Sequence, residues 1–359
     1  MRITAIDWYL VNQFVHEEMV NSPEYGAEEE KWDAIPKILV VVHTDEGVSG
    51  LGETPRGVSV DALVREAKEL LGRDPLQLEL AALPISAAIG GVYQAFEAAL
   101  VDLVGKIRGV SACELLGGRL AERVRVSYWA GRQTPEHSVR TARAALEKGY
   151  TCLKIKAKQG DPLVERVRAM YGAAPELKII IDPMQRYDDV DEVIRIAKAL
   201  EAFNVLCLED PLPKSNLENY QKLHRETSIP LALHVGTMAQ MEQGIEAGCI
   251  SIFNCSPRSM FTFVAMVNRA QQAGIPCWHG SGVDLGILDA SYLHSAAAAP
   301  NCSIPSDILS TSLHLDDFIV EAPQRSGEWM SVPTGPGLGC ELDMDAVNAY
   351  LIEKGRVGA

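Results

Sequence analysis

Cys152-Leu-Lys-Ile-Lys-Ala-Lys158 is the stretch of sequence on which the assignment of the fold depends. It follows Glu147-Lys-Gly-Tyr150 and has the alternation that is typical of a short strand. Residues i and i+2 of a strand point to the same face, so Lys154 and Lys156 project together. Burial and a neighbouring like charge both lower the pKa of a lysine, which can then accept a proton near neutral pH. The pair indicates either a catalytic base or two solvated lysines on an edge strand.

Strand-like runs recur from about residue 126 onward, with amphipathic helical stretches between them. The runs end near Trp129, Lys156, Asp182, Glu209, His234, Asn254 and His279. From Lys156 onward, successive ends are separated by between 20 residues (254 − 234) and 27 residues (209 − 182). Seven or more such βα units predict a closed parallel barrel. An open doubly wound sheet is the alternative, but no Gly-x-Gly-x-x-Gly turn follows any run to favour it.

Residues 1–125 are predicted to form a separate α+β domain that precedes the barrel. The pattern indicates strands at 3–10, 38–43 and 48–53, with a hairpin turn at Thr44-Asp-Glu-Gly47, and helices at 59–72 and 91–107. The barrel is expected to occupy residues 126–319. The tail 320–359 contains the loop Pro333-Thr-Gly-Pro-Gly-Leu-Gly339 and is expected to return to the N-terminal domain.

Composition and charge exclude several classes of partner. The chain of 359 residues has a formal net charge of −15, which argues against nucleic acid or an anionic membrane as a partner. No apolar run reaches the roughly 20 residues that span a bilayer, and the first residues lack the apolar stretch of a signal peptide. Eight scattered cysteines without a Cys-x-x-Cys pair favour a reducing environment, so we expect a cytoplasmic protein.

Ionisable side chains follow neighbouring strands of the predicted barrel, at the face where such barrels carry active sites. Lys178-Ile-Ile-Ile181 leads into Asp182, and Val205-Leu-Cys-Leu208 leads into Glu209. Two carboxylates with a third ligand beyond them describe a site for a hard cation, most simply Mg²⁺. Each carboxylate alone could instead be a helix cap or a surface charge.

Taken together, these motifs resemble the enolase superfamily in its mandelate racemase and muconate-lactonising branch, over nearly the whole chain. The resemblance rests on Ala95-Phe-Glu-Ala-Ala-Leu-Val-Asp-Leu-Val-Gly-Lys106, Leu115-Leu-Gly-Gly118, Lys154-Ile-Lys156, Asp182-Pro-Met-Gln185, Leu208-Glu-Asp-Pro211 and Pro336-Gly-Leu-Gly339. It implies an α/β fold in which an α+β capping domain covers a modified TIM barrel, (β/α)₇β. It also implies a homo-oligomer that acts on a small-molecule carboxylate.

The resemblance further implies abstraction of the proton α to a carboxylate, with an enolate stabilised by a divalent ion and lysines. By that match Asp182 and Glu209 bind Mg²⁺. Lys156 is the base, and Lys154 neutralises the substrate carboxylate and lowers the pKa of Lys156. Side chains at or near the last strand ends are expected to contact the substrate, namely Asn254, Ser256, Trp278 and Asp284.

Three positions depart from the family pattern. The fifth strand offers His234 where relatives carry Glu, Asp or Asn, and an imidazole ligand suits Mn²⁺, Fe²⁺ or Zn²⁺ better than Mg²⁺. Met184 replaces a frequent Asn. Asn254 stands where relatives carry a lysine or an aspartate that partners a histidine, so His279, near that histidine position, lacks its usual partner. We expect His279 to act as an acid or base, with Ser256 or Asn254 orienting its ring.

These features favour dehydration of a hydroxy acid by an enolase-superfamily lyase. The alternatives are a racemase, epimerase or cycloisomerase of the same superfamily, or a relative that binds a small acid without turning it over. An acidic segment in the region that closes over the site in this family would favour a cationic substrate. Its carboxylates are Glu17, Glu18, Glu24, Glu28, Glu29 and Glu30.

Overall fold

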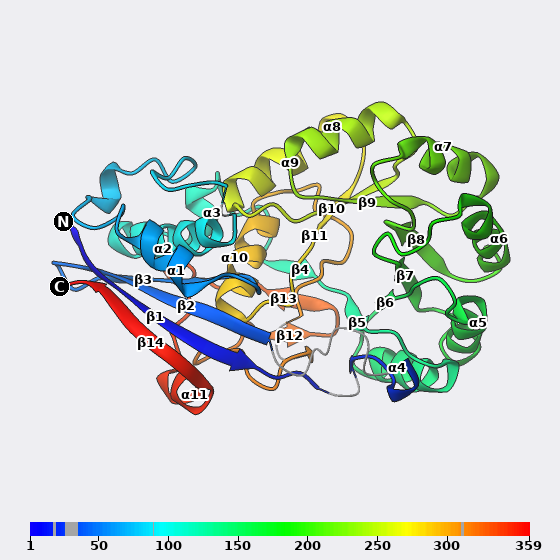
Figure 1. Ribbon diagram of the computed structural model, residues 1–359, viewed down its shortest axis with the longest axis horizontal. Coiled ribbons are helices and arrows are strands. Elements are labelled where there is room, and N and C mark those ends of the chain that lie inside the picture. Colours follow the sequence, from blue (N-terminus) through cyan, green and yellow to red (C-terminus); the bar gives the residue numbers. More distant parts are fainter. Residues whose placement is uncertain (17–18, 26–34, 89, 310–311) are drawn as a thin grey trace.

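A computed structural model describes residues 1–16, 19–25, 35–88, 90–309 and 312–359. Figure 1 shows two parts side by side, a sheet with helices that carries both chain termini and a barrel of strands ringed by helices. Most of the acidic segment, including Glu17, Glu18 and Glu28 to Glu30, lies outside the described residues. Among the described helices, none combines the length and apolar character needed to cross a bilayer.

The capping part is built on a four-stranded antiparallel sheet in the order β14-β1-β2-β3. Its strands are β1 (Ile3–Gln13), β2 (Ile35–Thr44), β3 (Ser49–Glu53) and β14 (Leu351–Gly358). The helical elements of this part are α1 (Val60–Ala67), η3 (Pro75–Gln77), α2 (Gly90–Arg108) and α3 (Ala112–Leu115), while the short η2 (Pro23–Tyr25) lies against the barrel, where the Tyr25 hydroxyl donates to the Gln133 carbonyl. Helix α2 lies against β3 because Gly50 and Gly52 have no side chain: a Cβ there would lie 2.1 Å from the carbonyl oxygens of Ala99 and Ala95.

The barrel contains seven parallel strands in the order β11-β10-β9-β8-β7-β6-β5. They are β5 (Tyr128–Ala130), β6 (Cys152–Lys156), β7 (Lys178–Asp182), β8 (Val205–Glu209), β9 (Leu231–Val235), β10 (Ile252–Cys255) and β11 (Cys277–His279). Segment 302–307 closes the barrel, since Cys302 bridges to Cys277 and Ser306 bridges to Val126, both in parallel. The closed ring brings all strand ends to one rim.

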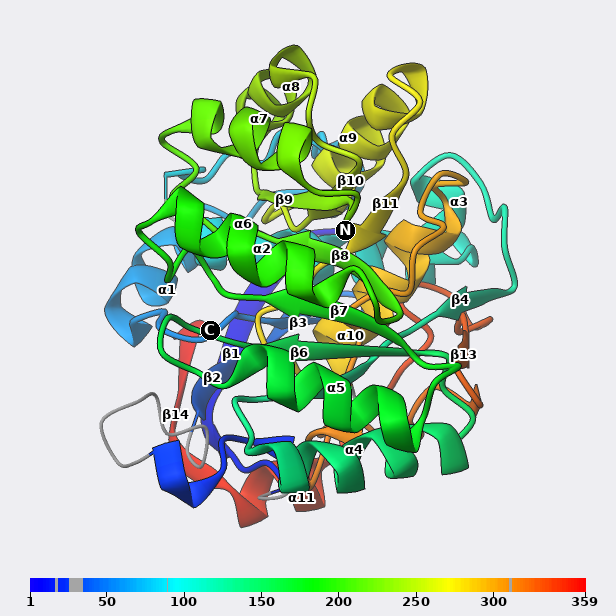
Figure 2. The same cartoon turned by 90° about the vertical axis from the view of Figure 1, so that its right-hand side faces the viewer.

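Helices pack around the outside of the strands, as Figure 2 shows for α4 to α8. They are α4 (Pro135–Glu147), α5 (Leu163–Ala173), α6 (Val190–Leu200), α7 (Leu217–Glu226), α8 (Met238–Ala247), α9 (Met260–Gln272) and α10 (Gly286–Ala297). Several begin where the sequence provides a capping side chain: Thr134, Thr237 and Ser259 each accept a hydrogen bond from a backbone N–H in the first turn.

The tail contains more regular structure than its loop-like sequence predicts. Strand β13 (Trp329–Ser331) pairs with β12 (Arg325–Ser326) on one side and with β4 (Arg123–Arg125) on the other, while helix α11 (Met344–Ala349) precedes β14. The pairing of β14 with β1 brings the end of the chain to the capping sheet. Strands β4, β12 and β13 have only two or three residues each, too few for an alternation to be recognised in the sequence.

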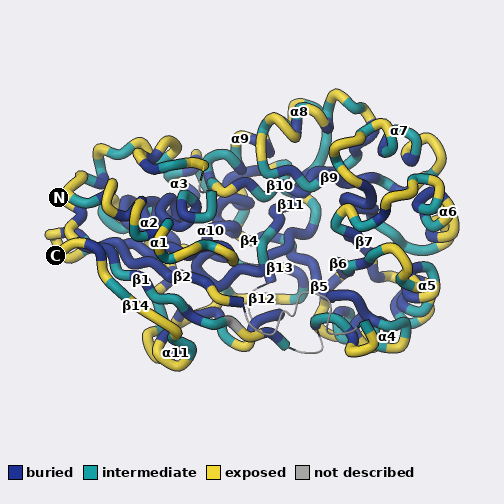
Figure 3. Tube along the Cα trace, in the orientation of Figure 1, coloured by how far each residue is buried: buried dark blue, intermediate teal, exposed yellow. Residues whose placement is uncertain are grey.

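Side chains of the barrel strands alternate between two layers, and this alternation positions the site. The inward layer includes Cys152, Ile180, Cys207, Ala232, Ile252 and Trp278, which form one buried cluster. The outward layer, including Leu153, Ile179 and Leu231, packs against the helices. Figure 3 shows the strands buried and the outer helix surfaces exposed. On each strand, the residue two positions after the inward-layer residue points to the same side and therefore faces the barrel interior at its C-terminal rim.

The fold predicted from the sequence is confirmed: a (β/α)₇β barrel lies under an α+β capping domain. The seven predicted strand ends fall within one residue of the observed ends. The edge-strand alternative for the two lysines is wrong, because β6 pairs with both β5 and β7.

Candidate active site

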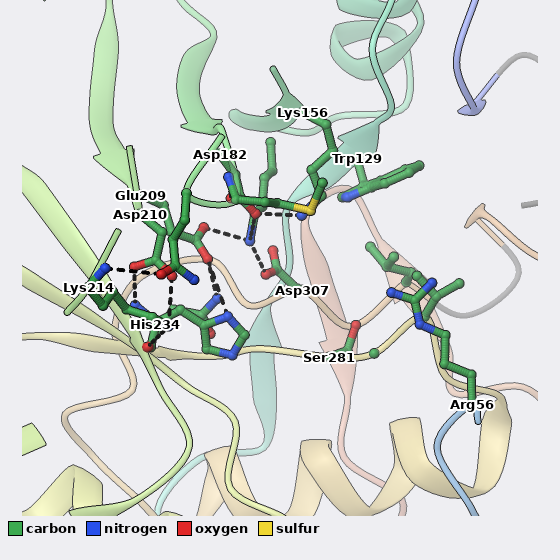
Figure 4. Close-up of a pocket in the computed structure, with 17 residues that line it drawn as sticks. Arg56, Trp129, Lys156, Asp182, Glu209, Asp210, Lys214, His234, Ser281 and Asp307 are labelled. Carbon is green, nitrogen blue, oxygen red and sulfur yellow. Dashed lines mark hydrogen bonds and ion pairs between the residues drawn. The ribbon is translucent and has the colours of Figure 1, made fainter. Parts of the chain in front are cut away.

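A pocket of about 250 Å³ lies at the C-terminal ends of the barrel strands. The ends of β6 to β10, the loop after β11 and the segment at 307–309 line it, and the capping domain contributes Arg56. Figure 4 shows Lys156 and Ser281 on opposite sides of this pocket, with Glu209, Asp210, Lys214 and His234 grouped along a third side. This volume suits a small molecule, since pockets for drug-sized ligands measure about 300–1,000 Å³.

Backbone strain is concentrated around this pocket. Among the described residues, five that are not glycine have a positive φ, and four of these line the pocket: Met184, Gln185, Asp210 and Val283. Each such residue costs about 1–3 kcal/mol and persists only where the surroundings enforce it. Strained residues cluster at functional sites, so their positions support the assignment of this pocket as the active site.

The Lys154 ammonium lies at the bottom of the pocket between three carboxylates. Its Nζ is 2.6 Å from Glu209 Oε2, 2.7 Å from Asp307 Oδ2 and 3.4 Å from Asp182 Oδ2. Burial alone would lower the pKa of Lys154, but the three carboxylates outweigh burial and raise the pKa well above its ordinary value. Lys154 is therefore a fixed positive charge at neutral pH.

Lys156, at the end of β6, is the more exposed of the two lysines. Its Nζ is 2.5 Å from Asp182 Oδ2, and 15% of the side chain is exposed, against 3% for Lys154. The backbone carbonyl of Lys156 accepts a hydrogen bond of 2.6 Å from Nη1 of the buried Arg166, which fixes the strand end. Lys156 is thus the lysine of the pair that solvent and a ligand can reach.

The two predicted carboxylate ligands carry opposite pKa shifts. Burial would raise the pKa of Asp182, but the ammonium groups of Lys156 and Lys154 outweigh burial and lower it. Burial, followed by the charge of Asp182, raises the pKa of Glu209 to about 8. Glu209 also accepts a hydrogen bond of 2.6 Å from Nδ2 of Asn254. Two neighbouring carboxylates therefore differ in their affinity for a proton, and Glu209 holds its proton more tightly than an exposed glutamate would.

His234 projects into the pocket beside Glu209. Its Nδ1 is 4.0 Å from Glu209 Oε1, and its Nε2 is hydrogen-bonded to the hydroxyl of Ser256. Partial burial and the ammonium groups of Lys154 and Lys214 lower the pKa of His234, so the ring is neutral at pH 7. A neutral imidazole whose second nitrogen has a hydrogen-bond partner is the form that binds metal ions.

The donor set fits a divalent cation. Asp182, Glu209 and His234 all line the pocket, and burial together with the charge of Asp182 raises the pKa of Glu209, so a bound cation would favour the ionised carboxylate that a metal ligand requires. Within the described part of the chain, no three acidic, His or Cys side chains already surround one point, so these groups would have to close around the ion. The imidazole favours Mn²⁺, Fe²⁺ or Zn²⁺ over Mg²⁺.

His279 does not line the pocket. Its ring stacks between Phe263 and Tyr292, with centroid distances of 4.1 and 4.2 Å, and Nδ1 lies 2.7 Å from the Gly280 carbonyl oxygen. The reason is the alternation of β11: Trp278 pairs with Asn254 in the inward layer, so the next residue, His279, faces the helices. The expected pairing of His279 with Asn254 or Ser256 is not observed.

Of the four predicted substrate-contact residues, two reach the pocket and two do not. Asn254 lines the pocket, and Ser256 reaches it through His234. Trp278 is fully buried under the pocket, where its Nε1 donates a hydrogen bond of 3.2 Å to Asp307. Asp284, in the loop after β11, is buried and forms an ion pair with Lys37, so it does not contact the pocket.

Asp307, Arg56 and Lys214 line the pocket and were not predicted from the sequence. Asp307 had a signal, because it ends the short run Ile304-Pro-Ser306, 28 residues (307 − 279) after His279. Lys214 lies on the loop after β8, where its Nζ is 2.9 Å from Asp210 Oδ2 and donates to the His234 carbonyl at 2.7 Å. Arg56 and Lys214 lie on loops, where no periodicity marks a residue.

Comparison with known proteins gives two family matches along the chain. The mandelate racemase / muconate lactonizing enzyme N-terminal domain matches residues 30–117, and the enolase C-terminal domain-like family matches residues 137–346. Among relatives, the N-succinyl-L-Arg/Lys racemase of Bacillus cereus is 24% identical over 98% of each chain. The D-galactonate dehydratase of Variovorax paradoxus is 28% identical over 86% of this chain and 90% of its own.

Solved structures agree at the level of the fold. The 2-chloromuconate cycloisomerase from Rhodococcus opacus matches with a TM-score of 0.85 at 22% identity, over 98% of this chain and 100% of that chain. The N-succinyl Arg/Lys racemase structure from Bacillus cereus matches with a TM-score of 0.83 at 22% identity, over 99% and 100%.

Proposed function

The chain belongs to the mandelate racemase/muconate lactonizing enzyme family of the enolase superfamily, and from this premise we propose that Lys156 serves as a single base in the dehydration of a hydroxy acid. Relatives of the chain are lyases and isomerases, so the chain is an enzyme of one of these two classes. Members of the family generally use a divalent metal, usually Mg²⁺. The specific reaction is our inference from the geometry of the pocket.

The observation that carries the proposal is the asymmetry of the pocket walls. On one side Lys156 is accessible and within 2.5 Å of Asp182. The facing wall consists of Ser281, Gly282 and Val283, and His279 is turned away behind it. A reaction with one proton-transferring group therefore fits better than one that needs a group on each face of the substrate.

The Lys154 ammonium would stabilise the charge that develops during proton abstraction. Loss of an α-proton beside a carboxylate concentrates negative charge on the substrate carboxylate oxygens, and a preoriented cation lowers the barrier to this step. Lys154 is held in place by Asp307 and Glu209, so it need not reorganise during the reaction. A divalent cation bound by Asp182, Glu209 and His234 would supply further positive charge for the same purpose.

One lysine can complete an elimination of water. Lys156 Nζ takes the α-proton, and the electron pair of that C–H bond forms the enolate. The C–O bond to the β-hydroxyl then breaks, and the departing oxygen receives the same proton from the Lys156 ammonium. Water leaves, and the enol product tautomerises to a 2-keto-3-deoxy acid. This sequence requires the α-hydrogen and the β-hydroxyl to lie on the same face of the substrate.

The proposal is tested with a set of aldonic acids of three to six carbons, incubated with the protein and Mg²⁺ or Mn²⁺ in D₂O. We expect a 2-keto-3-deoxy acid by NMR from at least one acid, with the activity reduced at least about 10³-fold in Lys156→Ala. Lys178→Ala is the matched control, because Lys178 is an exposed lysine at the opposite end of the neighbouring strand β7. Equal turnover by Lys156→Ala and the wild type would contradict the assignment of the base.

Racemisation is the second candidate, because it is the activity named for the Bacillus cereus relative. It would require a second acid or base on the wall of Ser281, Gly282 and Val283, where the described chain places no lysine or histidine. Formation of the opposite configuration without loss of water would favour it. Binding of metal and acids with neither exchange nor product would indicate a non-catalytic relative.

A further inference from the structure

A buried ionic network joins the capping sheet to the loop that forms the pocket wall opposite Lys156. Lys37 of β2 lies 2.8 Å from Glu53 Oε1 of β3 and 2.5 Å from Asp284 Oδ1 of the loop. All three side chains are fully buried. Buried carboxylates repel each other unless a cation lies between them, so Lys37 is what allows Glu53 and Asp284 to approach.

Glu53 holds the end of this loop in place. Helix α10 begins directly after the loop, and its N-cap residue, Leu285, has no side chain that could accept a hydrogen bond. The Glu53 carboxylate replaces the cap: it accepts the backbone N–H of Leu285 at 2.7 Å and that of Leu288 at 3.0 Å. A residue of the capping sheet thus satisfies free N–H groups at the start of a barrel helix.

Asp284 shapes the loop itself. Its Oδ2 accepts the backbone N–H of Gly282 at 2.6 Å and the hydroxyl of Tyr292 at 2.7 Å. Val283, between Gly282 and Asp284, adopts φ +64°, a conformation that a β-branched residue rarely takes. Such a conformation persists only when its surroundings enforce it, and the hydrogen bond from Gly282 to the Asp284 carboxylate spans this residue and is one such constraint.

The loop continues into the acidic cluster on its other side. Gly280 packs so closely on Asn254 that a Cβ would lie 2.1 Å from Oδ1 of the amide, and Asn254 in turn donates to Glu209. The loop is therefore held at one end by the capping sheet and at the other by a side chain that contacts Glu209. Ser281, Gly282 and Val283, between these ends, face the pocket.

We propose that Lys37 and Glu53 are positioning residues, which act through Asp284 to hold Ser281, Gly282 and Val283 in the conformation that forms the pocket wall opposite Lys156. Neither residue touches the pocket. The capping domain thereby sets the shape of the substrate site from 247 residues away in sequence (284 − 37). The proposal concerns the loop and does not depend on which reaction the pocket performs.

The test is amide hydrogen exchange of the full-length protein, which needs no substrate. In Lys37→Met we expect the amides of Gly282 and Leu285 to exchange at least tenfold faster, because their acceptors Asp284 and Glu53 are no longer held together. Lys106→Met is the matched control: it removes an ammonium from the buried Asp102 in the same domain, and Asp102 holds Leu51 and Leu338 instead. The control should leave residues 280–288 protected.

A second variant separates positioning from simple attachment of the two domains. In Lys37→Met/Val283→Gly, glycine adopts the positive φ without strain, so we expect protection of Gly282 to recover at least threefold relative to Lys37→Met. A network that merely attached the domains would not be rescued in this way. Should Lys37→Met fail to fold, Asp284→Asn provides the same exchange readout and the same rescue.

Unchanged exchange in Lys37→Met, or equal loss in Lys37→Met and Lys106→Met, would overturn the proposal, as would absence of rescue by Val283→Gly. Failure of the dehydration assay leaves these exchange rates untouched, so the two proposals are judged separately.

Discussion

The Lys154 ammonium lies 2.7 Å from the Asp307 carboxylate, and this pair gives the two lysines of Lys154-Ile-Lys156 different properties. Lys154 is surrounded by acids at the bottom of the barrel, and its pKa is raised well above the ordinary value. Lys156 shares only Asp182 with it and is partly exposed to the pocket. A fixed cation and an accessible amine, two residues apart on one strand, are what proton abstraction next to a carboxylate requires.

Removing the Lys154 ammonium from between Asp182, Glu209 and Asp307 should strongly destabilise the protein. Lys154→Met leaves the carboxylates of Asp307 and Glu209 buried without a cation, which typically costs about 3–5 kcal/mol of unfolding free energy. Asp307→Asn should cost less, because Lys154 keeps two other acidic partners. In urea denaturation, the double variant is expected to lose less than the sum of the two single losses. Strict additivity would show that the two side chains do not interact.

Replacing His279 should leave the chemistry largely intact. Its ring is packed between Phe263 and Tyr292 and faces away from the pocket, so His279→Gln is expected to keep the turnover rate within about tenfold of the wild type. The comparison is Lys156→Ala, for which we expect a loss of at least about 10³-fold. A loss of that size in folded His279→Gln would restore His279 to the catalytic machinery.

Stability should depend on pH through the same histidine. Burial lowers the pKa of His279 from 6.5 to about 4, so the unfolded chain binds the proton more readily than the native one between these values. The unfolding free energy therefore falls as the pH drops from 6.5 towards 4, by about 2 kcal/mol between pH 7 and 5 from this group. Other buried histidines add to the wild-type slope with the same sign, and His279→Gln should remove this share of it. Parallel wild-type and variant curves would contradict the assigned pKa.

Metal preference should follow the side chain at position 234. With an imidazole in the donor set, we expect Mn²⁺ to bind at least about tenfold more tightly than Mg²⁺. His234→Asp should narrow this ratio, because a third carboxylate suits Mg²⁺. Titration calorimetry of both ions measures the ratio, and Asp182→Asn, which removes a carboxylate, should weaken both. An unchanged ratio in His234→Asp would mean that His234 is not a ligand.

Much of the fold could be predicted because buried parallel strands are continuous apolar runs that end in a polar residue. Lys178-Ile-Ile-Ile181 before Asp182 is such a run, and its end was placed correctly. The three residues of β11 were too few to establish which side chain faces inward, so Trp278 and His279 could not be told apart. Lys154, Lys156, Asp182, Glu209 and His234 lie on strands of five residues, where the alternation is easier to recognise.

Contacts between distant segments could not be predicted from one sequence. Asp284 was expected at the substrate, but its partner Lys37 lies in the capping sheet, and no local pattern connects them. Asp307 follows a segment that closes the barrel through isolated bridges, without a regular strand to mark it. The homo-oligomer stays a prediction, which sedimentation would check. The preference for a cationic substrate that the acidic segment would give also stays a prediction, since most of that segment lies outside the described residues.

The configuration of unreacted substrate tests the central claim most directly. An aldonic acid that the protein dehydrates is incubated in D₂O to partial conversion, and the remaining acid is recovered and analysed by NMR and chiral chromatography. With Lys156 as the single base, the recovered acid should retain its original configuration at the α-carbon, whether or not it carries deuterium there. Recovery of the deuterated opposite configuration would show a second proton-transferring group on the facing wall and would contradict the account.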